Sequence, residues 1–475
     1  MSNYSGSNRS VLHVVVLAAG KGTRMRSARP KVLHPIAGRS MLDRVLDAAE
    51  SLHPASVRVV IGFAAEQIQA ACARPGIDWV VQAEQLGTGH AVACAVANLE
   101  QTDLGVTDED RVLVLYGDVP LLAQDVLEPL LATAWDHALS VLTTILDEPG
   151  GYGRIIRNSD GQLVAIREHR DASPDEHAIS EINTGMLVAR LGDLRQWLPQ
   201  LAPHNAQGEL YLTDIVSMAE AQNKTIATRT EPDPLRVAGV NDRWALAEIE
   251  RAWQRRQAQQ LALAGTTIID PSRLDIRGVV TSGIDNVIDI NVVLEGVVNL
   301  GNNVMIEPNC VLRNVTLGDG VRVRAFSHLD GAELAAGVEV GPFARLRPGT
   351  RLAAGSRVGN FVEIKASFIG KGSKINHLSY IGDTTMGAEC NIGAGTITCN
   401  YDGANKHHTE IGDAVFVGSS AQLVAPVRIG DGATIGAGST ITNDVPAGHL
   451  AIARARQIVS GGWLRPQKTP KKTQD

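Results

Sequence analysis

A run of small residues between positions 17 and 25 is the first part of the chain that could do chemistry. It reads Leu17-Ala18-Ala19-Gly20-Lys21-Gly22-Thr23-Arg24-Met25 and follows a strand-like apolar stretch. Small residues at the carboxyl end of a strand let backbone N–H groups approach phosphates or a base closely. The run is not a G-x-G-x-x-G fingerprint, because Met25 stands at the third glycine, and no Gly-Lys-Ser/Thr closes it as a Walker loop. A glycine loop alone is weak evidence, since many such loops are only tight turns.

Charged and amide side chains follow this loop along the chain. Arg24 and Lys31 lie in one basic stretch, and two cations beside a glycine loop suit phosphoryl transfer, although solvated surface side chains are the plainer interpretation. Asp118 follows a second apolar run, where a carboxylate is a good Mg²⁺ ligand because Mg²⁺ prefers hard oxygens. Asn241 offers a neutral hard oxygen, although a helix N-cap is the alternative interpretation of this residue.

The loop resembles the signature of the sugar-1-phosphate nucleotidyltransferases, L-A-A-G-x-G-T-R-M followed by P-K, and the match extends through Pro30-Lys31. The resemblance implies attack of a sugar-1-phosphate oxygen on the α-phosphorus of UTP, with Mg²⁺ on Asp118 and Asn241 and with Arg24 and Lys31 as catalytic cations. Gln82 would read the uracil edge. The substrate contacts that the resemblance implies are Leu17, Ala18, Ala19, Gly20, Lys31, Gln82, Gly87, Thr88, Tyr116, Gly117, Asp118, Gly153, Glu168, Asn183 and Asn241.

The elements that must position these residues alternate between strand-like and helical segments. Strands are predicted at 11–17, 57–61, 79–81 and 111–116, and helices at 41–52, 64–72 and 89–99. This alternation favours a mostly parallel sheet with helices on both faces, an α/β Rossmann-like domain. Residues 241–264 contain no Gly or Pro, and this unbroken segment predicts one long linker helix.

The second half of the chain has an aliphatic residue at nearly every sixth position. Such a period fits neither a helix nor a simple strand, and it predicts a solenoid of short strands with one inward residue each, a left-handed parallel β-helix of hexapeptide repeats. The periodic positions are Leu294, Leu300, Ile306, Leu312, Leu317, Val323, Leu329, Leu334, Val340, Leu346, Leu352, Val358, Ile364, Ile369, Ile375, Ile381, Met386, Ile392, Ile411, Val417, Leu423, Ile429, Ile435 and Ile441.

Polar side chains interrupt this regular pattern at several places. The period breaks between Thr398 and Ile411, which predicts a loop that carries function or, alternatively, a tolerated surface insertion. Arg347 and Lys365 could clamp a sugar phosphate. His377 could accept a proton from an attacking amine, although a hydrogen bond at a solenoid corner is the plainer interpretation of a single histidine.

Taken together, these motifs resemble the bifunctional bacterial enzymes that make UDP-N-acetylglucosamine, over about residues 11–465. The resemblance implies that His377 is the base toward glucosamine-1-phosphate, with Glu363 orienting its imidazole. The implied contacts to the sugar phosphate are Arg347, Lys365, Tyr380 and Asn391. The implied contacts to acetyl-CoA are Ala394, Asn400, Tyr401, Ser419, Ala437 and Arg454. The resemblance also implies a homotrimer and a product that feeds peptidoglycan and lipopolysaccharide precursors.

Composition restricts the remaining possibilities. The formal net charge of −7 gives no reason to expect a nucleic acid or an anionic membrane as partner. The five cysteines form no C-x-x-C pair, which favours a reducing cytoplasm over a disulfide framework or a zinc site. The predicted organisation is a disordered leader (1–10), a uridyltransferase domain (11–240), a linker helix (241–265), a β-helix acetyltransferase domain (266–448), and an arm with a disordered tail (449–475).

Two other functions are compatible with parts of this pattern. The chain could be a single-activity nucleotidyltransferase whose β-helix only oligomerises or binds a regulator, because the solenoid fold alone does not prove catalysis. It could also be a nucleotide-sugar sensor or scaffold. Asp118, Lys31 and Arg24 argue against a sensor, which has no need to keep a metal ligand and two transfer-site cations together.

Overall fold

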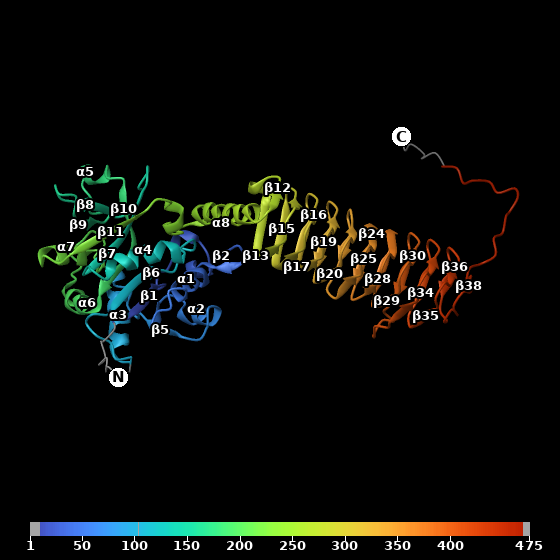
Figure 1. Ribbon diagram of the computed structural model, residues 1–475, viewed down its shortest axis with the longest axis horizontal. Coiled ribbons are helices and arrows are strands. Elements are labelled where there is room, and N and C mark those ends of the chain that lie inside the picture. The colour runs from blue at the N-terminus through green and yellow to red at the C-terminus, as the bar shows by residue number, and fades with distance from the viewer. Residues whose placement is uncertain (1–9, 103, 469–475) are drawn as a thin grey trace, which may run out of the picture. The chain divides into compact units, whose positions relative to one another are not determined.

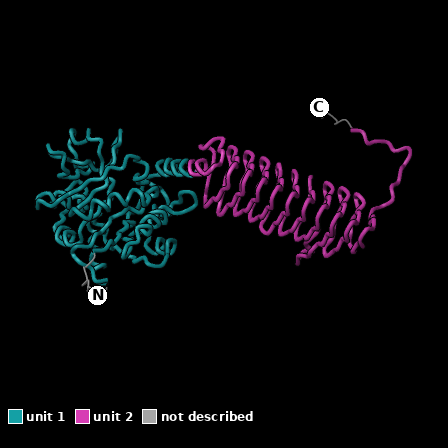
Figure 2. Tube along the Cα trace, in the orientation of Figure 1, with its two compact units in different colours: residues 1–257 teal, residues 258–475 magenta. Residues whose placement is uncertain are grey.

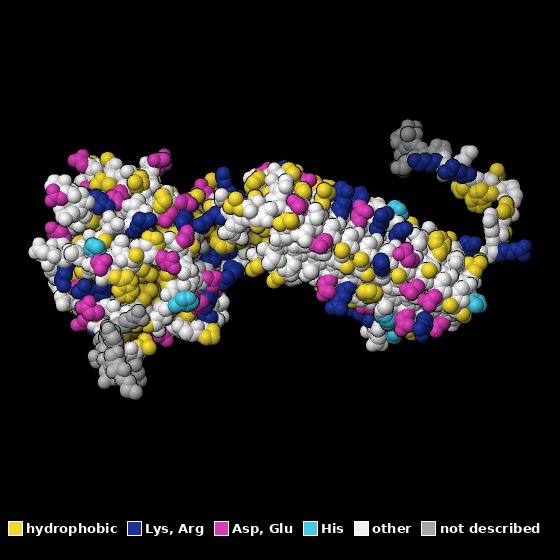
Figure 3. Space-filling view, viewed as in Figure 1, with side chains coloured by type: hydrophobic (Ala, Val, Ile, Leu, Met, Phe, Trp, Pro, Cys, Tyr) yellow, Lys and Arg dark blue, Asp and Glu magenta, His cyan; other side chains and the backbone are white. Residues whose placement is uncertain are grey.

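The computed structural model describes residues 10–102 and 104–468 of the chain. The chain forms two compact units, residues 1–257 and 258–475 (Figure 2). Most of the predicted leader and the end of the predicted tail, residues 1–9 and 469–475, lie outside the described residues. No helix among the residues described is long and apolar enough to cross a membrane. On the face in Figure 3, basic and acidic side chains are interspersed over both units.

A central sheet in the first unit confirms the α/β prediction (Figure 1). Its strand order is β11-β7-β10-β6-β1-β4-β5. Strands β1, β4, β5 and β6 are parallel, whereas β10 runs antiparallel to both β6 and β7. The strand bounds are β1 Leu12–Leu17, β4 Ser56–Ile61, β5 Ile77–Val81, β6 Arg111–Tyr116, β7 Leu139–Ile145, β8 Arg154–Arg157, β9 Leu163–Arg167, β10 Glu181–Arg190 and β11 Ile226–Glu231.

Apolar side chains alternate across this sheet because successive residues of a strand point to opposite faces. On β1, Val14 and Val16 pack in one core cluster, while Val15 and Leu17 pack in another on the other face. Helices cover both faces, and the strand and helix boundaries predicted from the sequence fall within two residues of those observed. The helix bounds are α1 Met41–Glu50, α2 Ala65–Ala71, α3 Thr88–Glu100, α4 Gln124–Ala134, α5 Pro174–His177, α6 Leu191–Trp197, α7 Asp214–Ala221 and α8 Arg243–Leu263.

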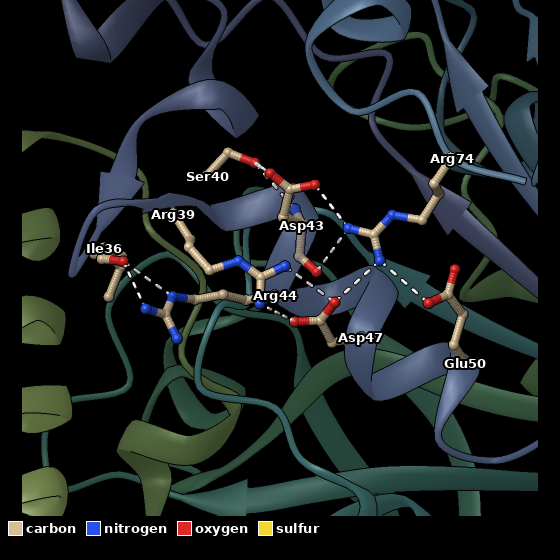
Figure 4. Close-up of polar contacts among 8 residues, drawn as sticks. All are labelled: Ile36, Arg39, Ser40, Asp43, Arg44, Asp47, Glu50 and Arg74. Atoms are coloured by element: carbon tan, nitrogen blue, oxygen red, sulfur yellow. Dashed lines mark hydrogen bonds and ion pairs between the residues drawn. The ribbon is translucent and has the colours of Figure 1, made fainter. Parts of the chain in front are cut away.

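The segment that carries Lys31 is anchored by α1. A short hairpin, β2 (Pro35–Ile36) and β3 (Arg39–Ser40), leads from Lys31 into this helix. The Arg44 guanidinium donates two hydrogen bonds to the Ile36 carbonyl (Figure 4). It also lies 3.7 Å from the Trp253 ring centroid. Arg74 meanwhile forms ion pairs with three acidic residues of α1, which are Asp43, Asp47 and Glu50. Buried and paired charges therefore hold the hairpin and α1 in one arrangement.

The second unit is the predicted left-handed parallel β-helix, and every periodic aliphatic residue predicted from the sequence is buried in one continuous core. Its strands stack in three faces. The first face contains β12 Thr266–Ile268, β14 Asn286–Ile288, β16 Met305–Ile306, β18 Arg322–Val323, β21 Glu339–Val340, β24 Arg357–Asn360, β27 Lys374–His377, β30 Asn391–Ile392, β33 Phe416–Val417, β36 Thr434–Ile435 and β38 Leu450–Ala451.

The other two faces share three long strands, β13 Leu274–Ser282, β15 Val292–Leu300 and β17 Val311–Leu317. The second face continues with β19 His328–Asp330, β22 Arg345–Leu346, β25 Glu363–Lys365, β28 Tyr380–Gly382, β31 Ile397–Cys399, β34 Gln422–Val424 and β37 Thr440–Ile441. The third face continues with β20 Ala332–Leu334, β23 Thr350–Leu352, β26 Phe368–Ile369, β29 Thr384–Met386, β32 Thr409–Ile411 and β35 Val427–Ile429.

The break in the six-residue period begins later than predicted. Thr398 is fully buried and pairs in register with Leu423, so it occupies an inward position of the coil. Its hydroxyl accepts a hydrogen bond from Gly382 N at 2.8 Å and lies 3.2 Å from Gly382 O. The excursion starts only after Cys399, and the prediction that Thr398 itself breaks phase is wrong because a satisfied hydroxyl can replace an aliphatic group in the core.

Candidate active sites

A cleft of about 920 Å³ opens at the carboxyl ends of β1 and β6 in the first unit. Ligands bind at this edge of open α/β sheets because loops from neighbouring strands converge there. The cleft is lined by nearly all the substrate contacts predicted from the sequence, namely Leu17, Ala18, Ala19, Gly20, Lys31, Gln82, Gly87, Thr88, Tyr116, Asp118, Gly153, Glu168, Asn183 and Asn241. Gly117 is packed instead toward Leu42 and Ala18, beside the lining.

Four side chains from three distant parts of the chain meet at this cleft. The Lys31 ammonium forms an ion pair with Asp118 and donates a hydrogen bond to Asn241 Oδ1 at 3.2 Å. Arg24 donates to the same oxygen at 2.9 Å. Because one cation reaches both Asp118 and Asn241, their two oxygens lie close enough to share a metal ion. A carboxylate and an amide oxygen also suit Mg²⁺, so the residues fit this ion.

The N-cap interpretation of Asn241 is wrong. Helix α8 is capped by Asp242, whose Oδ1 accepts hydrogen bonds from Trp244 N and Ala245 N, both at 2.9 Å. The side chain of Asn241 is thereby left to face Arg24 and Lys31. The neighbouring Val240 N donates to the Asp118 carbonyl at 2.9 Å, which fixes the two candidate ligand loops against each other.

Gly22 allows Lys31 to lie against the glycine loop. Its φ of 57° is in the left-handed region, and a Cβ atom at this position would stand 2.5 Å from Lys31 Cβ. A side chain here would be strained and would also displace Lys31. A glycine at position 22 is therefore a steric requirement of this arrangement.

Glu168 and Asn183 lie at the side of the cleft formed by β9 and β10. Burial is the main cause that raises the pKa of Glu168, and the nearby acidic residues add to this shift. Its Oε1 accepts a hydrogen bond from Thr213 at 3.0 Å. Asn183 N donates to Gly153 O at 2.9 Å, and its side-chain oxygen accepts from Gly185 N. Two directional polar groups therefore face the cleft beside Gly153.

Gln82 is almost fully buried, and its position is set by the segment that follows it. Its Nε2 donates to Gly87 O at 3.1 Å and lies 3.1 Å from His90 Nδ1 on α3. Gly87 has a φ of 115°, and a Cβ there would stand 2.6 Å from Leu210 O. The side-chain amide is thus fixed at the edge of the cleft.

Sequence reasoning missed several residues that line the cleft, among them Tyr152, Tyr211 and Thr213. They come from irregular segments and the start of α7, where no periodic pattern marks a residue as facing a site. Burial raises the pKa of both tyrosine hydroxyl groups. These rings and hydroxyls therefore form part of the cleft wall.

In the second unit, His377 ends strand β27 at a corner of the coil. Its Nδ1 lies 2.8 Å from the side-chain oxygen of Asn360, on the preceding coil. Glu363, predicted to orient this ring, is instead paired with Arg347 at 2.9 Å and with Arg345 at 3.8 Å. The side chain in hydrogen-bonding contact with the imidazole is therefore Asn360, which sequence reasoning missed.

A group of charged residues lies on the second face and its corner. Lys365 forms an ion pair with Asp383 at 3.4 Å, and Asp383 also accepts a hydrogen bond from Asn400. The Lys365 ammonium lowers the pKa of Lys406, in the excursion, because two like charges near each other repel. The loop therefore brings Asn400 and a further cation near Lys365 and Asp383, and no pattern in the sequence predicts this proximity.

Three of the predicted acetyl-CoA contacts occupy one column with His377. Each of His377, Ala394, Ser419 and Ala437 directly precedes a residue with positive φ, and these four corner residues are Leu378, Gly395, Ser420 and Gly438. Arg454 donates to the Ala437 carbonyl at 2.6 Å, at the end of this column. Tyr401 is largely exposed in the excursion. Asn391 lies on the first face, whereas Tyr380 lies on the second.

An α/β unit with a cleft of this kind, followed by a hexapeptide β-helix, defines a two-domain transferase. Residues 14–186 match the MobA-like NTP transferase domain, and residues 408–443 match the bacterial transferase hexapeptide (six repeats). The chain is 52% identical to the bifunctional protein GlmU of Marinobacter nauticus, over 97% of this chain and 100% of that protein. It is 55% identical to the protein of the same name from Alkalilimnicola ehrlichii, over 97% of both chains.

A third relative of the same name, from Stutzerimonas stutzeri, is 53% identical over 96% of this chain and 99% of its own. The chain belongs to the GlmU family of bifunctional proteins. It is accordingly an enzyme of UDP-N-acetylglucosamine and cell-wall biosynthesis, with uridyltransferase and acetyltransferase activities. The single-activity alternative is not favoured, because the relatives match over both units.

Proposed function

We propose that the cleft of the first unit transfers UMP from UTP to N-acetylglucosamine-1-phosphate. Backbone N–H groups of the glycine loop would approach the triphosphate, and Gln82 would read the uracil edge. Glu168 and Asn183 would bind hydroxyl and acetamido groups of the sugar. A sugar-phosphate oxygen then forms a bond to the α-phosphorus as pyrophosphate leaves, and no covalent enzyme intermediate is needed.

Arg24 and Lys31 would stabilise the charge that develops on the phosphates. Asp118 and Asn241 would hold Mg²⁺, which neutralises phosphate charge and orients the triphosphate when it is bound. The observation that carries this part of the proposal is the convergence of Lys31 and Arg24 on the oxygens of Asp118 and Asn241. Solvated surface cations, the plainer interpretation, would have no reason to meet there.

In the second unit, His377 would act as the general base for acetylation of glucosamine-1-phosphate. The 2-amino nitrogen forms a bond to the acetyl carbonyl carbon and the C–S bond of acetyl-CoA breaks. The proton lost by the amine passes through His377 to the departing thiolate, so that CoA leaves as a thiol. Arg347, Lys365, Tyr380 and Asn391 would hold the sugar phosphate, and Lys406 joins them as a third cation.

Acetyl-CoA would lie along the corner column that begins at His377. Its contacts would be Ala394, Ser419 and Ala437, with Arg454 at one end and Asn400 and Tyr401 on the excursion. Small side chains along this column leave room for an extended ligand beside the imidazole. We also propose that the chain forms a homotrimer in the cytoplasm and that its partners are small molecules only. Its product would also feed lipopolysaccharide precursors.

Release of CoA thiol from acetyl-CoA and glucosamine-1-phosphate tests the proposal. The wild-type chain should release CoA, and His377→Ala should lose about 10²–10⁴-fold in kcat, the range for removal of a general base. His328→Ala, an exposed histidine of β19 on an earlier coil, is the matched control and should retain wild-type rates. A fully active His377→Ala would overturn the role of this histidine.

A further inference from the structure

The His377 imidazole is held by one side chain of the neighbouring coil. Asn360 and His377 are register partners in the parallel pair β24 and β27. The Asn360 side-chain oxygen lies 2.8 Å from His377 Nδ1, and the Asn360 carbonyl accepts a hydrogen bond from Leu378 N at 3.0 Å. Side chain and backbone of one asparagine thus contact the histidine and the residue after it.

The coil geometry makes this contact rigid. Both residues directly precede a corner residue with positive φ, Phe361 at 55° and Leu378 at 47°. Parallel strands of adjacent coils lie about 4.8 Å apart, so side chains at the same corner position are the right distance for one hydrogen bond. The stacked coils therefore hold acceptor and ring in place before any substrate binds.

The chemistry of the contact selects one form of the ring. A side-chain carbonyl oxygen can only accept a hydrogen bond, so a neutral imidazole facing it carries its proton on Nδ1. The other nitrogen, Nε2, then keeps its lone pair and can accept a proton. Asn360 is uncharged at every pH at which the enzyme works, whereas the carboxylate of Glu363 is committed to Arg347.

We infer that Asn360 is the positioning residue of the acetyltransferase site, which fixes His377 in the Nδ1–H tautomer and leaves Nε2 as the base. The inference rests on the proposed role of His377. It assigns to a neutral amide the orienting function that a carboxylate was predicted to perform. The amide orients the ring without adding a negative charge beside it.

The first test reads the tautomer directly in the full-length enzyme. With ¹⁵N-labelled histidine, the His377 ring signals are identified by their loss in His377→Gln, and nitrogen shifts are recorded above the ring's titration. Wild type should show Nδ1–H, and Asn360→Ala should shift the ring toward Nε2–H. A wild-type ring already in the Nε2–H form, as an amide in the opposite orientation would produce, overturns the inference, and so does a tautomer that Asn360→Ala leaves unchanged.

The second test separates positioning from simple structural damage. Asn360→Ala should lower kcat for CoA release at least about tenfold with each KM within twofold, because the base is misaligned while binding is intact. Asn360→Asp keeps the acceptor and should recover most of kcat. Its added charge favours the imidazolium, so the acid limb of the pH–rate profile should move to higher pH. Wild-type kcat and an unmoved acid limb in both variants would overturn the inference.

A matched control removes a similar contact far from His377. Asn299 on β15 accepts a hydrogen bond from Thr281 of the preceding coil at 2.6 Å, and Asn299→Ala should leave kcat and the pH profile as in wild type.

Failure of the inference is also distinguishable from failure of the proposed function. If His377→Ala keeps its activity, the proposed base is wrong, whereas an inactive His377→Ala beside fully active Asn360 variants refutes the positioning role alone.

Discussion

The ammonium of Lys31 bridges Asp118 and Asn241, which lie 87 and 210 residues further along the chain. One side-chain cation thus already contacts both proposed magnesium ligands. Lys31 lies where the negative charge of Asp118 is balanced, and the same electrostatic demand would favour the proposed divalent ion at this site.

Replacement of Asp118 by Ala should abolish uridyl transfer and spare acetyl transfer. The variant removes a proposed metal ligand and the ion-pair partner of Lys31, so pyrophosphate release should fall by at least about 10²-fold. CoA release should stay within twofold of wild type, because the acetyltransferase residues lie in the other unit. Asp136→Ala, at an exposed position of the same unit, is the control. Loss of both activities in a folded variant would contradict the independence of the two sites.

Removal of divalent metal by EDTA should have the same selectivity as the Asp118 variant. Pyrophosphate release should stop and should return on addition of excess Mg²⁺, whereas CoA release should continue unchanged. Both products are measured in parallel on one preparation. If chelation also stops CoA release, a metal serves the acetyltransferase site, contrary to the proposed mechanism.

Glu168→Gln should increase stability at neutral pH while impairing uridyl transfer. Because burial raises the Glu168 pKa, the folded state binds the proton more tightly than the unfolded state does. Wild-type stability therefore falls as pH rises from the unfolded pKa, about 4.3, through the raised folded pKa, and the amide variant lacks this loss. Melting curves from pH 4 to 8 should show that the Tm of the variant rises relative to the Tm of wild type as pH increases. A difference in Tm that stays constant across this pH range would show that ionised Glu168 is not disfavoured in the folded protein.

Thr398→Val should destabilise the β-helix although valine has nearly the same shape. The Thr398 hydroxyl is the acceptor for Gly382 N, and valine would leave this buried N–H unsatisfied at a cost of about 1–3 kcal/mol. Urea unfolding monitored on the second unit measures the change. Thr440→Val, at an exposed position of β37, should have an effect within about 0.5 kcal/mol. Equal stability of Thr398→Val and wild type would mean that Gly382 N finds another acceptor.

Much of the fold could be predicted from the sequence because those elements depend on residues that are close together along the chain. The glycine loop after β1, the strand at Arg111–Tyr116 and the buried six-residue period each follow from neighbouring residues. The antiparallel insertion of β10 between β6 and β7 was not predicted, since strand order depends on contacts across the whole unit. Thr398 was assigned to the break in the period because its side chain is polar, although it occupies an inward position of the coil.

The candidate sites show the same division between local and distant information. Residues near the glycine loop were assigned from a contiguous motif, and they lie in one cleft. Asn360 and Glu363 are three positions apart, and only the register of adjacent coils determines which of them faces His377 and which faces Arg347. The proximity of Lys406 to Lys365 depends on the path of the excursion after Cys399, and the six-residue period does not describe that path.

The excursion after Cys399 leaves the stacking of the β-helix intact. Val340, Val358, Ile375 and Ile392 follow one another at intervals of 17 or 18 residues on the first face, and the next partner, Val417, comes 25 residues later with its pairing unchanged. Extra chain inserted at a corner is therefore structurally neutral for the coils on either side. An architecture of this kind can lengthen, shorten or rewrite its corner loops, and so acquire a new ligand specificity, without having to evolve a new core.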